Sequence, residues 1–255
     1  GLAPRRQAEM KARRIVVGLG PAPQSRAALE AAAAIARLLD AELDALFVES
    51  EALLRLAGLP FARELGASSA SARPLDAAAV ERAMRAQAAE ARRLLAGVAD
   101  PRAVRWSLRV ARGAEGEQLR AASSGADLAV ASVTRWGPEA LALAQGAPTT
   151  LLVVPRTGRF TGPLAAVCPV AIDPAQAVAL LRSLSRAVGG GLTLLVTGED
   201  LVAAGHWCEA AGAALDAAGL RAQLEIVRES QPEALQAAIE RLAPRAVAIL
   251  APSAP

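Results

Sequence analysis

The stretch from Ala131 to Pro148, ASVTRWGPEALALAQGAP, has the residue types and the position that could hold a phosphate. It follows an apolar run, 127–130, that predicts a strand, and it leads into a short helical pattern. A glycine-containing turn between a strand and a helix is where many α/β proteins bind phosphate, because backbone N–H groups and the helix dipole both attract an anion. The stretch is therefore either a nucleotide loop or a plain chain reversal.

The other residues that could do chemistry form no catalytic motif. The one histidine, His206, lies within a predicted helix, and Cys168 and Cys208 lack the spacing of a metal or redox motif. The GxSxG, HExxH and Walker A patterns do not occur, and Lys11 is the only lysine. We expect His206 and both cysteines to be structural, and the chain to be no enzyme and to hold no metal or cofactor.

Composition narrows the class of partner. The chain has 255 residues with a net charge of +3 and a pI of about 9.6, and residues 1–12 are expected to form a basic N-terminal leader. Because no aromatic residues are interleaved with these bases, we expect no nucleic-acid partner. No apolar run approaches the roughly 18 residues of a membrane span, and no signal peptide is visible, so we expect a cytoplasmic protein without membrane insertion.

Hydrophobic periodicity predicts strands and helices in alternation. The predicted strands of the first part of the chain are 14–20, 43–48, 104–110, 127–132 and 150–154, and its predicted helices are 25–40, 77–95 and 115–122. Residues 51–76, rich in Ala, Ser and Pro, are expected to be irregular. This alternation is typical of a parallel sheet with right-handed crossovers.

The later part of the chain repeats this order. The segment 170–175 parallels 18–22, LTLLVTGED (192–200) parallels LDALFVESE (43–51), and AVAILAPS (246–253) parallels ADLAVASV (126–133). The repeat predicts an α/β fold of two tandem open parallel-sheet units. We expect unit 1 at 13–155, a linker at 156–161, and a truncated unit 2 at 162–255 without a fifth strand.

This order of elements resembles the universal stress protein (UspA-like) family, in its tandem form. The resemblance is carried by RRIVVGLGPAPQSRAALEAA near the start, ADLAVAS at the fourth strand and APTTLLVVP at the fifth. It implies a Rossmann-like, adenine nucleotide alpha hydrolase-like fold, complete over 13–155 and incomplete over 162–253. It also implies that ATP is the ligand to test, since many members bind it.

ATP-binding members are expected to carry an Asp at the end of strand one and a glycine loop, roughly G-x2-G-x9-G-[ST], after strand four. Here Gly20 replaces the Asp, and Ser132 and Arg135 replace the first two loop glycines. The loop is also shorter, Pro138 lacks an N–H to donate, and Glu139 would repel a phosphate at the helix N-terminus. We therefore expect a degenerate loop that does not bind ATP in the family's manner.

Should a nucleotide such as ATP or AMP, or another anion, bind after all, the resemblance still indicates where. The residues implied as cofactor-binding are Gly18, Gly20, Val48, Ser132, Thr134, Arg135 and Gly137 in the first unit and Asp173, which keeps the strand-one acid, in the second unit. Two other glycine clusters, 113–116 and 189–191, are interpreted as a helix start and as a helix C-cap with its turn.

The resemblance also implies how the units assemble, since fifth strands of the family pair across a dimer or between tandem units. Only the first unit has that strand (150–154). We expect an asymmetric pseudo-dimer within the chain, with one uncovered strand edge through which a homodimer could form.

Three functions stay open. The first is a non-enzymatic module of the stress response, acting through protein contacts or an unidentified small ligand. The second is an ATP- or AMP-binding sensor or weak ATPase that uses a rebuilt site around Gly20, Thr134 and Arg135. The third is a cytosolic regulatory domain of a larger transporter or kinase.

Overall fold

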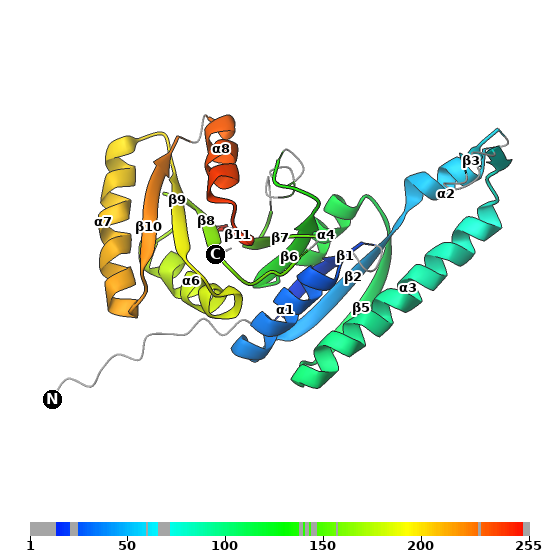
Figure 1. Cartoon of the computed structure of the whole chain (residues 1–255), viewed down its shortest axis with the longest axis horizontal. Helices are drawn as coiled ribbons and strands as arrows, with labels where there is room; N and C mark the ends of the chain where they lie inside the picture. The colour runs from blue at the N-terminus through cyan, green and yellow to red at the C-terminus, as the bar shows by residue number, and fades with distance from the viewer. Residues whose placement is uncertain are drawn as a thin grey trace.

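The computed structural model describes residues 14–20, 25–59, 61–65, 72–137, 140, 143, 147–156, 158–228 and 231–251. Strands and helices alternate along this part of the chain (Figure 1). In chain order they are β1 (Arg14–Leu19), α1 (Arg26–Leu39), β2 (Glu42–Ser50), α2 (Glu51–Ala57), β3 (Arg63–Leu65), β4 (Ala72–Pro74), α3 (Ala77–Ala99), a 3-10 turn η1 (Asp100–Arg102), β5 (Trp106–Gly113), α4 (Glu115–Ser123), β6 (Leu128–Val133), β7 (Leu151–Pro155), β8 (Leu164–Pro169), α6 (Pro174–Val188), β9 (Leu192–Thr197), α7 (Leu201–Ala218), β10 (Ala222–Val227), α8 (Pro232–Leu242) and β11 (Ala246–Ile249).

Nine of the strands form one continuous sheet in the order β10-β9-β8-β11-β7-β6-β1-β2-β5. All neighbours in it are parallel except β7 and β11, which run antiparallel with Val153 opposite Val247 and Leu151 opposite Ile249. We name the elements from β1 to β7 the first half and those from β8 to β11 the second half. The sheet confirms the predicted α/β class.

The two halves order their strands in the same way. From the sheet's ends toward its centre, the first half reads β5-β2-β1-β6-β7 and the second half reads β10-β9-β8-β11. Each half therefore places its first strand between its second and fourth strands. This order is compatible with two units, and the predicted domain boundaries stay predictions.

The last strand of the second half, β11, is paired on both of its sides. β11 is parallel to β8 on one side and antiparallel to β7 on the other. β7 pairs on both of its sides, with β6 and with β11, so one fifth strand serves both halves. The open edges of the sheet are β5 and β10 instead.

Helices cover both faces of the sheet, with α1 and α6 below it and α4 and α8 above it in Figure 1. The lower face forms the main core, which runs through both halves, and α1 packs directly against α6. Ala28, Ala32 and Ile35 of α1 are fully buried, and the small alanine side chains allow the helix to lie close to its neighbours. Burial of this apolar stripe is the main stabilising contribution of the helix.

Residues 51–76 are more regular than predicted. They contain α2, β3 and β4, and Figure 1 shows this segment projecting beyond the end of the sheet with the start of α3. The Ser50 hydroxyl caps α2 by accepting a hydrogen bond from the Leu53 N–H at 3.3 Å, and Glu51 pairs with Arg55 one turn later. Helix α3 continues to Ala99, one turn beyond the prediction.

The three side chains expected to be structural are on or under α7. Cys168 is fully buried in the main core, and burial raises its pKa to about 12, while Cys208 is half-buried. His206 lies exposed on α7. The indole N–H of Trp207 donates to the carbonyl of Ile172 at 2.7 Å and fastens α7 to the turn after β8. Within the described residues, no cluster of His, Cys, Asp and Glu could hold a metal ion.

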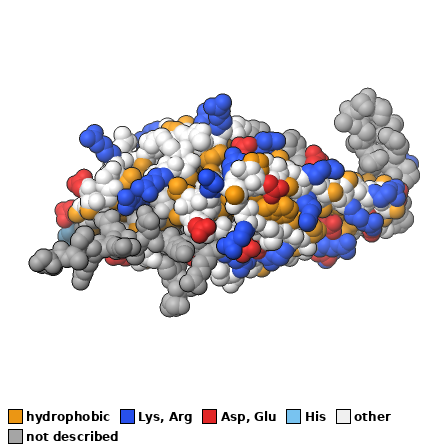
Figure 2. All heavy atoms as spheres, turned by 90° about the horizontal axis from the view of Figure 1, so that it is seen from below, with side chains coloured by type: hydrophobic (Ala, Val, Ile, Leu, Met, Phe, Trp, Pro, Cys, Tyr) orange, Lys and Arg blue, Asp and Glu red, His pale blue; other side chains and the backbone are white. Residues whose placement is uncertain are grey.

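The surface and the helix lengths bear on partners. On the face shown in Figure 2, basic and acidic side chains are interspersed. None of the helices in the described part of the chain is long and apolar enough to cross a membrane.

Candidate functional site at the carboxyl ends of the first-half strands

The strands β1, β2, β5, β6 and β7 are parallel, so their carboxyl ends meet at one edge of the sheet. We name it the first-half carboxyl edge. In open sheets, ligands lie outside the carboxyl ends of the strands. The predicted site residues at or near this edge are Gly18, Gly20, Val48, Ser132, Thr134, Arg135 and Gly137.

Asp173 does not belong to this group. It follows β8, which is parallel to β11, and β11 is antiparallel to β7. β8 therefore ends at the opposite edge of the sheet from β1. There the Asp173 carboxylate caps α6 by accepting a hydrogen bond from the Gln176 N–H at 2.9 Å. Asp173 cannot complete a site with the other seven residues, and its carboxylate already stabilises a helix start.

The two strand-one glycines have structural reasons. A Cβ on Gly18 would lie 3.4 Å from a methyl carbon of Leu119, so this glycine lets α4 pack closely on β1. The Gly20 carbonyl accepts a hydrogen bond from the Ser25 hydroxyl at 2.9 Å, next to the first turn of α1. Among the described residues, a side chain at Gly20 would meet nothing within 4 Å. Of the two glycines, Gly20 is therefore the one whose surroundings in the described part of the chain leave room for a ligand.

Val48 and Ser132 are strand residues with covered side chains. Val48 pairs with Ala111 of β5 and packs against the cluster under α4. Ser132 pairs with Val154 of β7 and is 7% exposed. The resemblance implies a glycine at this position, and the serine adds a Cβ there.

The turn after β6 divides its residues between solvent and core. Thr134 and Arg135 are exposed, and Gly137 is buried. Trp136, between them, is half-buried and packs against two separate hydrophobic clusters. One cluster lies under α4 in the first half, and the other lies under α8 in the second half.

Trp136 is the residue that the sequence interpretation passed over. It lies in the loop that the resemblance implies as a phosphate loop. Its indole packs against both the first-half and the second-half cluster on the upper face of the sheet. The available signal was composition, since the chain has only three tryptophans and its aromatic content is 2%. A rare large aromatic in a loop is more often an anchor than a solvated side chain.

A cavity of about 410 Å³ opens beside this turn. Its walls come from the start of α4, from the ends of β6 and β7, and from Leu143. The polar side chains that line it are Ser132, Glu115, Glu117, Arg120 and Arg156. Two carboxylates and two guanidinium groups thus face one volume, which lies within the range of small-ligand sites.

The first turn of α4 sets the charge at this cavity. Ala114 is its N-cap and gives no side-chain hydrogen bond, while Glu115 and Glu117 follow in the first turn. Carboxylates there stabilise the helix dipole and oppose a second anion at the same place. This agrees with the interpretation of 113–116 as a helix start. The cluster 189–191 is likewise a C-cap, since Gly189 ends α6 with a φ of 74°.

Pro138, Glu139 and Gly146 lie outside the described residues. The arguments from the missing N–H of Pro138 and the charge of Glu139 therefore stay predictions. Two observations on described residues do not depend on these predictions. Trp136 packs against two hydrophobic clusters, and the first turn of the neighbouring helix α4 is acidic.

The arrangement of this sheet agrees with solved structures. A universal stress protein from Archaeoglobus fulgidus DSM 4304 is similar over 96% of this chain and 100% of its own, with 12% identity and a TM-score of 0.58. The chain has the universal stress protein fold. A functionally unknown protein from Pseudomonas aeruginosa PAO1 is similar over 97% of this chain and 94% of its own, with 15% identity and a TM-score of 0.52. No protein-family model and no curated protein sequence matches the chain.

Proposed function

We propose that the chain is a non-enzymatic module with the universal stress protein fold that does not bind ATP in the manner expected of that family. The observation that carries the proposal is Trp136. It lies in the loop after β6, where the resemblance implies a phosphate site, and its side chain packs against clusters of both halves. If the loop rearranged to bind a triphosphate, the Trp136 indole would have to leave two apolar clusters, which costs several kcal/mol.

Charge supports the same proposal. Glu115 and Glu117 stand in the first turn of α4, on the wall of the cavity. Their charges oppose a nucleotide phosphate and suit a ligand or a protein side chain that brings a positive group. We infer that the module acts by binding such a positively charged group. Its cytoplasmic location stays a prediction.

A nucleotide sensor is the second candidate, and the cavity is the observation in its favour. The cavity lies at the carboxyl ends of parallel strands, and Arg120 and Arg156 line it. Because both arginines have other partners or share the cavity with carboxylates, the first proposal accounts for more of the geometry.

Titration calorimetry with ATP, ADP and AMP, each with Mg²⁺, separates the two candidates. We expect no heat of binding at ligand concentrations up to 1 mM. A Kd tighter than about 10 μM would stabilise the protein by roughly 3 kcal/mol at about 1 mM ligand and would overturn the proposal. As a matched pair, Arg156→Ala should remove any such binding and Arg186→Ala, on α6 of the other face, should not.

A further inference from the structure

The sheet ends on two edge strands, β5 and β10, which each have a hydrogen-bonded neighbour on one side only. The outer side of an edge strand carries N–H and C=O groups that can pair with another strand. Proteins guard such edges with charged side chains or cover them with other elements. The two edges of this sheet differ in how well they are guarded.

Charged groups guard β5. Arg109 binds Asp44 of β2 on one face of the sheet, with an Nη2 to Oδ2 distance of 2.6 Å. Arg112 binds Glu49 on the other face, with an Nε to Oε2 distance of 2.9 Å. A strand added beside β5 would have to approach two cations that are held along this edge, and this cost disfavours pairing.

β10 is apolar on one face of the sheet. Leu224 and Ile226 are 36% and 41% exposed, and as residues two apart they share one face. Glu225 lies between them on the opposite face, where the Arg241 guanidinium of α8 binds both of its carboxylate oxygens at 2.6 Å. Leu201 and Val202, at the start of the adjoining helix α7, are also exposed, by 46% and 67%.

We propose that β10 pairs antiparallel with β10 of a second copy of this chain, across a two-fold axis that passes beside Leu224. Opposite residues of an antiparallel pair share a face, so a symmetric pair must be centred on a residue. Centring on Leu224 brings five residues of each strand into register. Leu224 then faces the partner's Leu224, and Ala222 faces the partner's Ile226.

Hydrogen-bond complementarity favours this register and a copy of the same chain as the occupant. Gln223 faces the partner's Glu225 twice, once on each side of the axis, and an amide N–H can donate to a carboxylate there. Centring on Glu225 would oppose two carboxylates, and centring on Gln223 would pair only three residues of the strand. The strand therefore complements itself, which is the requirement of a two-fold interface.

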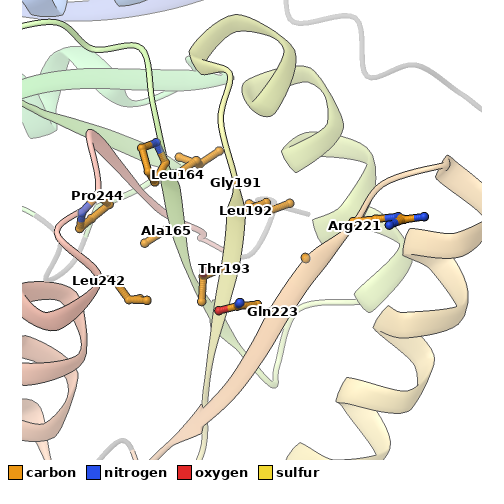
Figure 3. Close-up of a pocket in the computed structure, with 11 residues that line it drawn as sticks. Leu164, Ala165, Gly191, Leu192, Thr193, Arg221, Gln223, Leu242 and Pro244 are labelled. Carbon is orange, nitrogen blue, oxygen red and sulfur yellow. The ribbon is translucent and has the colours of Figure 1, made fainter.

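The same pairing completes a second cavity. A hollow of about 340 Å³ lies over Ala165, Thr193 and Gln223, which come from three neighbouring strands, with Leu242 and Pro244 beside it (Figure 3). Arg221 lines it at the β10 side, and in Figure 3 its guanidinium points away from the other labelled side chains. A second β10 would extend the floor of the hollow by one strand and place the partner's Glu225 at its open side.

Disulfide trapping tests the interface at one atom pair. Opposite Cα atoms of an antiparallel pair lie about 4.5–5.5 Å apart, within the reach of a disulfide. Leu224→Cys in a Cys208→Ser background should give a covalent dimer under mild oxidation. Val110→Cys, on the guarded edge and 51% exposed, should stay monomeric. A dimer from Val110→Cys, or none from Leu224→Cys, overturns the proposal.

Light scattering of the unmodified chain gives an independent readout that does not need a variant to fold. We expect a mass of about twice 26.0 kDa at micromolar concentration. Ile226→Lys should weaken the dimer at least tenfold, and Val110→Lys should leave it unchanged, with circular dichroism as the check on folding. A monomer of the unmodified chain up to 100 μM contradicts the interface, whatever the nucleotide titrations show.

Discussion

In the first half, Asp44 of β2 lies on the α4 face of the sheet, where Arg109 binds it through two nitrogens and the Ser107 hydroxyl donates at 3.2 Å. The residue that parallels Asp44 in the repeat is Thr193 of β9, and the one that parallels Ser107 is Gln223 of β10. Those two side chains lie under the hollow of about 340 Å³. An ionic network therefore lies over Asp44 and Ser107 in the first half, whereas a hollow lies over the equivalent residues of the second half.

The difference shows that the sheet fixes where side chains point and leaves their chemistry open. In the first half, arginine side chains fill the space over the strands, and in the second half shorter side chains leave it open. The loop after β6 shows the same independence, since Trp136, in the loop where the resemblance implies a ligand, packs against two clusters. Substitutions at equivalent positions of the two halves should therefore have unequal effects.

The largest difference in the free energy of unfolding is expected at the turn between the first helix and the second strand of each half. In the first half Asp40 makes this turn alone, at a φ of 52°. In the second half Gly190 makes it at a φ of +77°, and a Cβ there would lie 2.3 Å from the carbonyl carbon of Gly162. Gly190→Ala should therefore lower the free energy of unfolding by about 3–4 kcal/mol, measured by urea denaturation.

Gly191→Ala is the matched control for that prediction. A side chain at Gly191 would meet nothing within 4 Å, so its effect should stay below about 0.5 kcal/mol. Equal losses in the two variants would show that the close approach to Gly162 does not limit this turn.

The next effect concerns the joint between the halves. Trp136→Ala removes a half-buried indole from two clusters and should cost about 2–3 kcal/mol in urea denaturation. Arg135→Ala, its exposed neighbour, should cost less than about 0.5 kcal/mol. If the two variants unfold at the same urea concentration, Trp136 is not a packing anchor.

Much of this fold could be predicted from local patterns. The strand ending at Leu19 and the helix from Leu201 to Ala218 follow directly from hydrophobic periodicity, and the repeat indicated the parallel order. Residues 51–76 were predicted less well because their elements are short and rich in Ala and Ser, so they carry little periodicity. Helix α2 depends on the Ser50 cap more than on an apolar face.

The candidate site could be predicted only in part. The carboxyl edge followed from the parallel sheet, and Gly20 with Ser132 was correctly placed there. Asp173, predicted as the strand-one acid of the second unit, lies at the opposite end of the strands because β7 and β11 are antiparallel, a long-range contact that no local pattern encodes. The packing of Trp136 could not be predicted for the same reason, since the second cluster that it contacts is formed by residues of the second half, far away in the sequence.

A smaller effect is expected at Asp44 and its counterpart Thr193. Asp44→Asn removes the charge that binds Arg109 and the second guanidinium contact, from Arg14 at 3.3 Å. Because both arginines are partly exposed, the loss should be about 1–2 kcal/mol. Thr193→Ala, its counterpart, should cost less than about 0.5 kcal/mol. Equal costs would mean that the network adds nothing to the first half.

The smallest effect uses the second half's two cysteines as reporters. With a pKa raised to about 12 by burial, Cys168 is almost entirely protonated at pH 8 and should not react with a thiol reagent in the folded state. Cys208, half-buried on α7, should react first. Raising the pH toward 12 should increase the reactivity of Cys168, and its labelling at pH 8 in an unmodified chain would contradict the buried position.

The central claim is that the loop after β6 joins the two halves through Trp136 instead of holding a phosphate. Hydrogen exchange of Trp136→Ala against the unmodified chain, read strand by strand by mass spectrometry, tests it most directly. The claim predicts faster exchange both in β6 and β7 and in β8 and β11, because each pair borders one of the two clusters. Faster exchange confined to β6 and β7, with β8 and β11 unchanged, would contradict it.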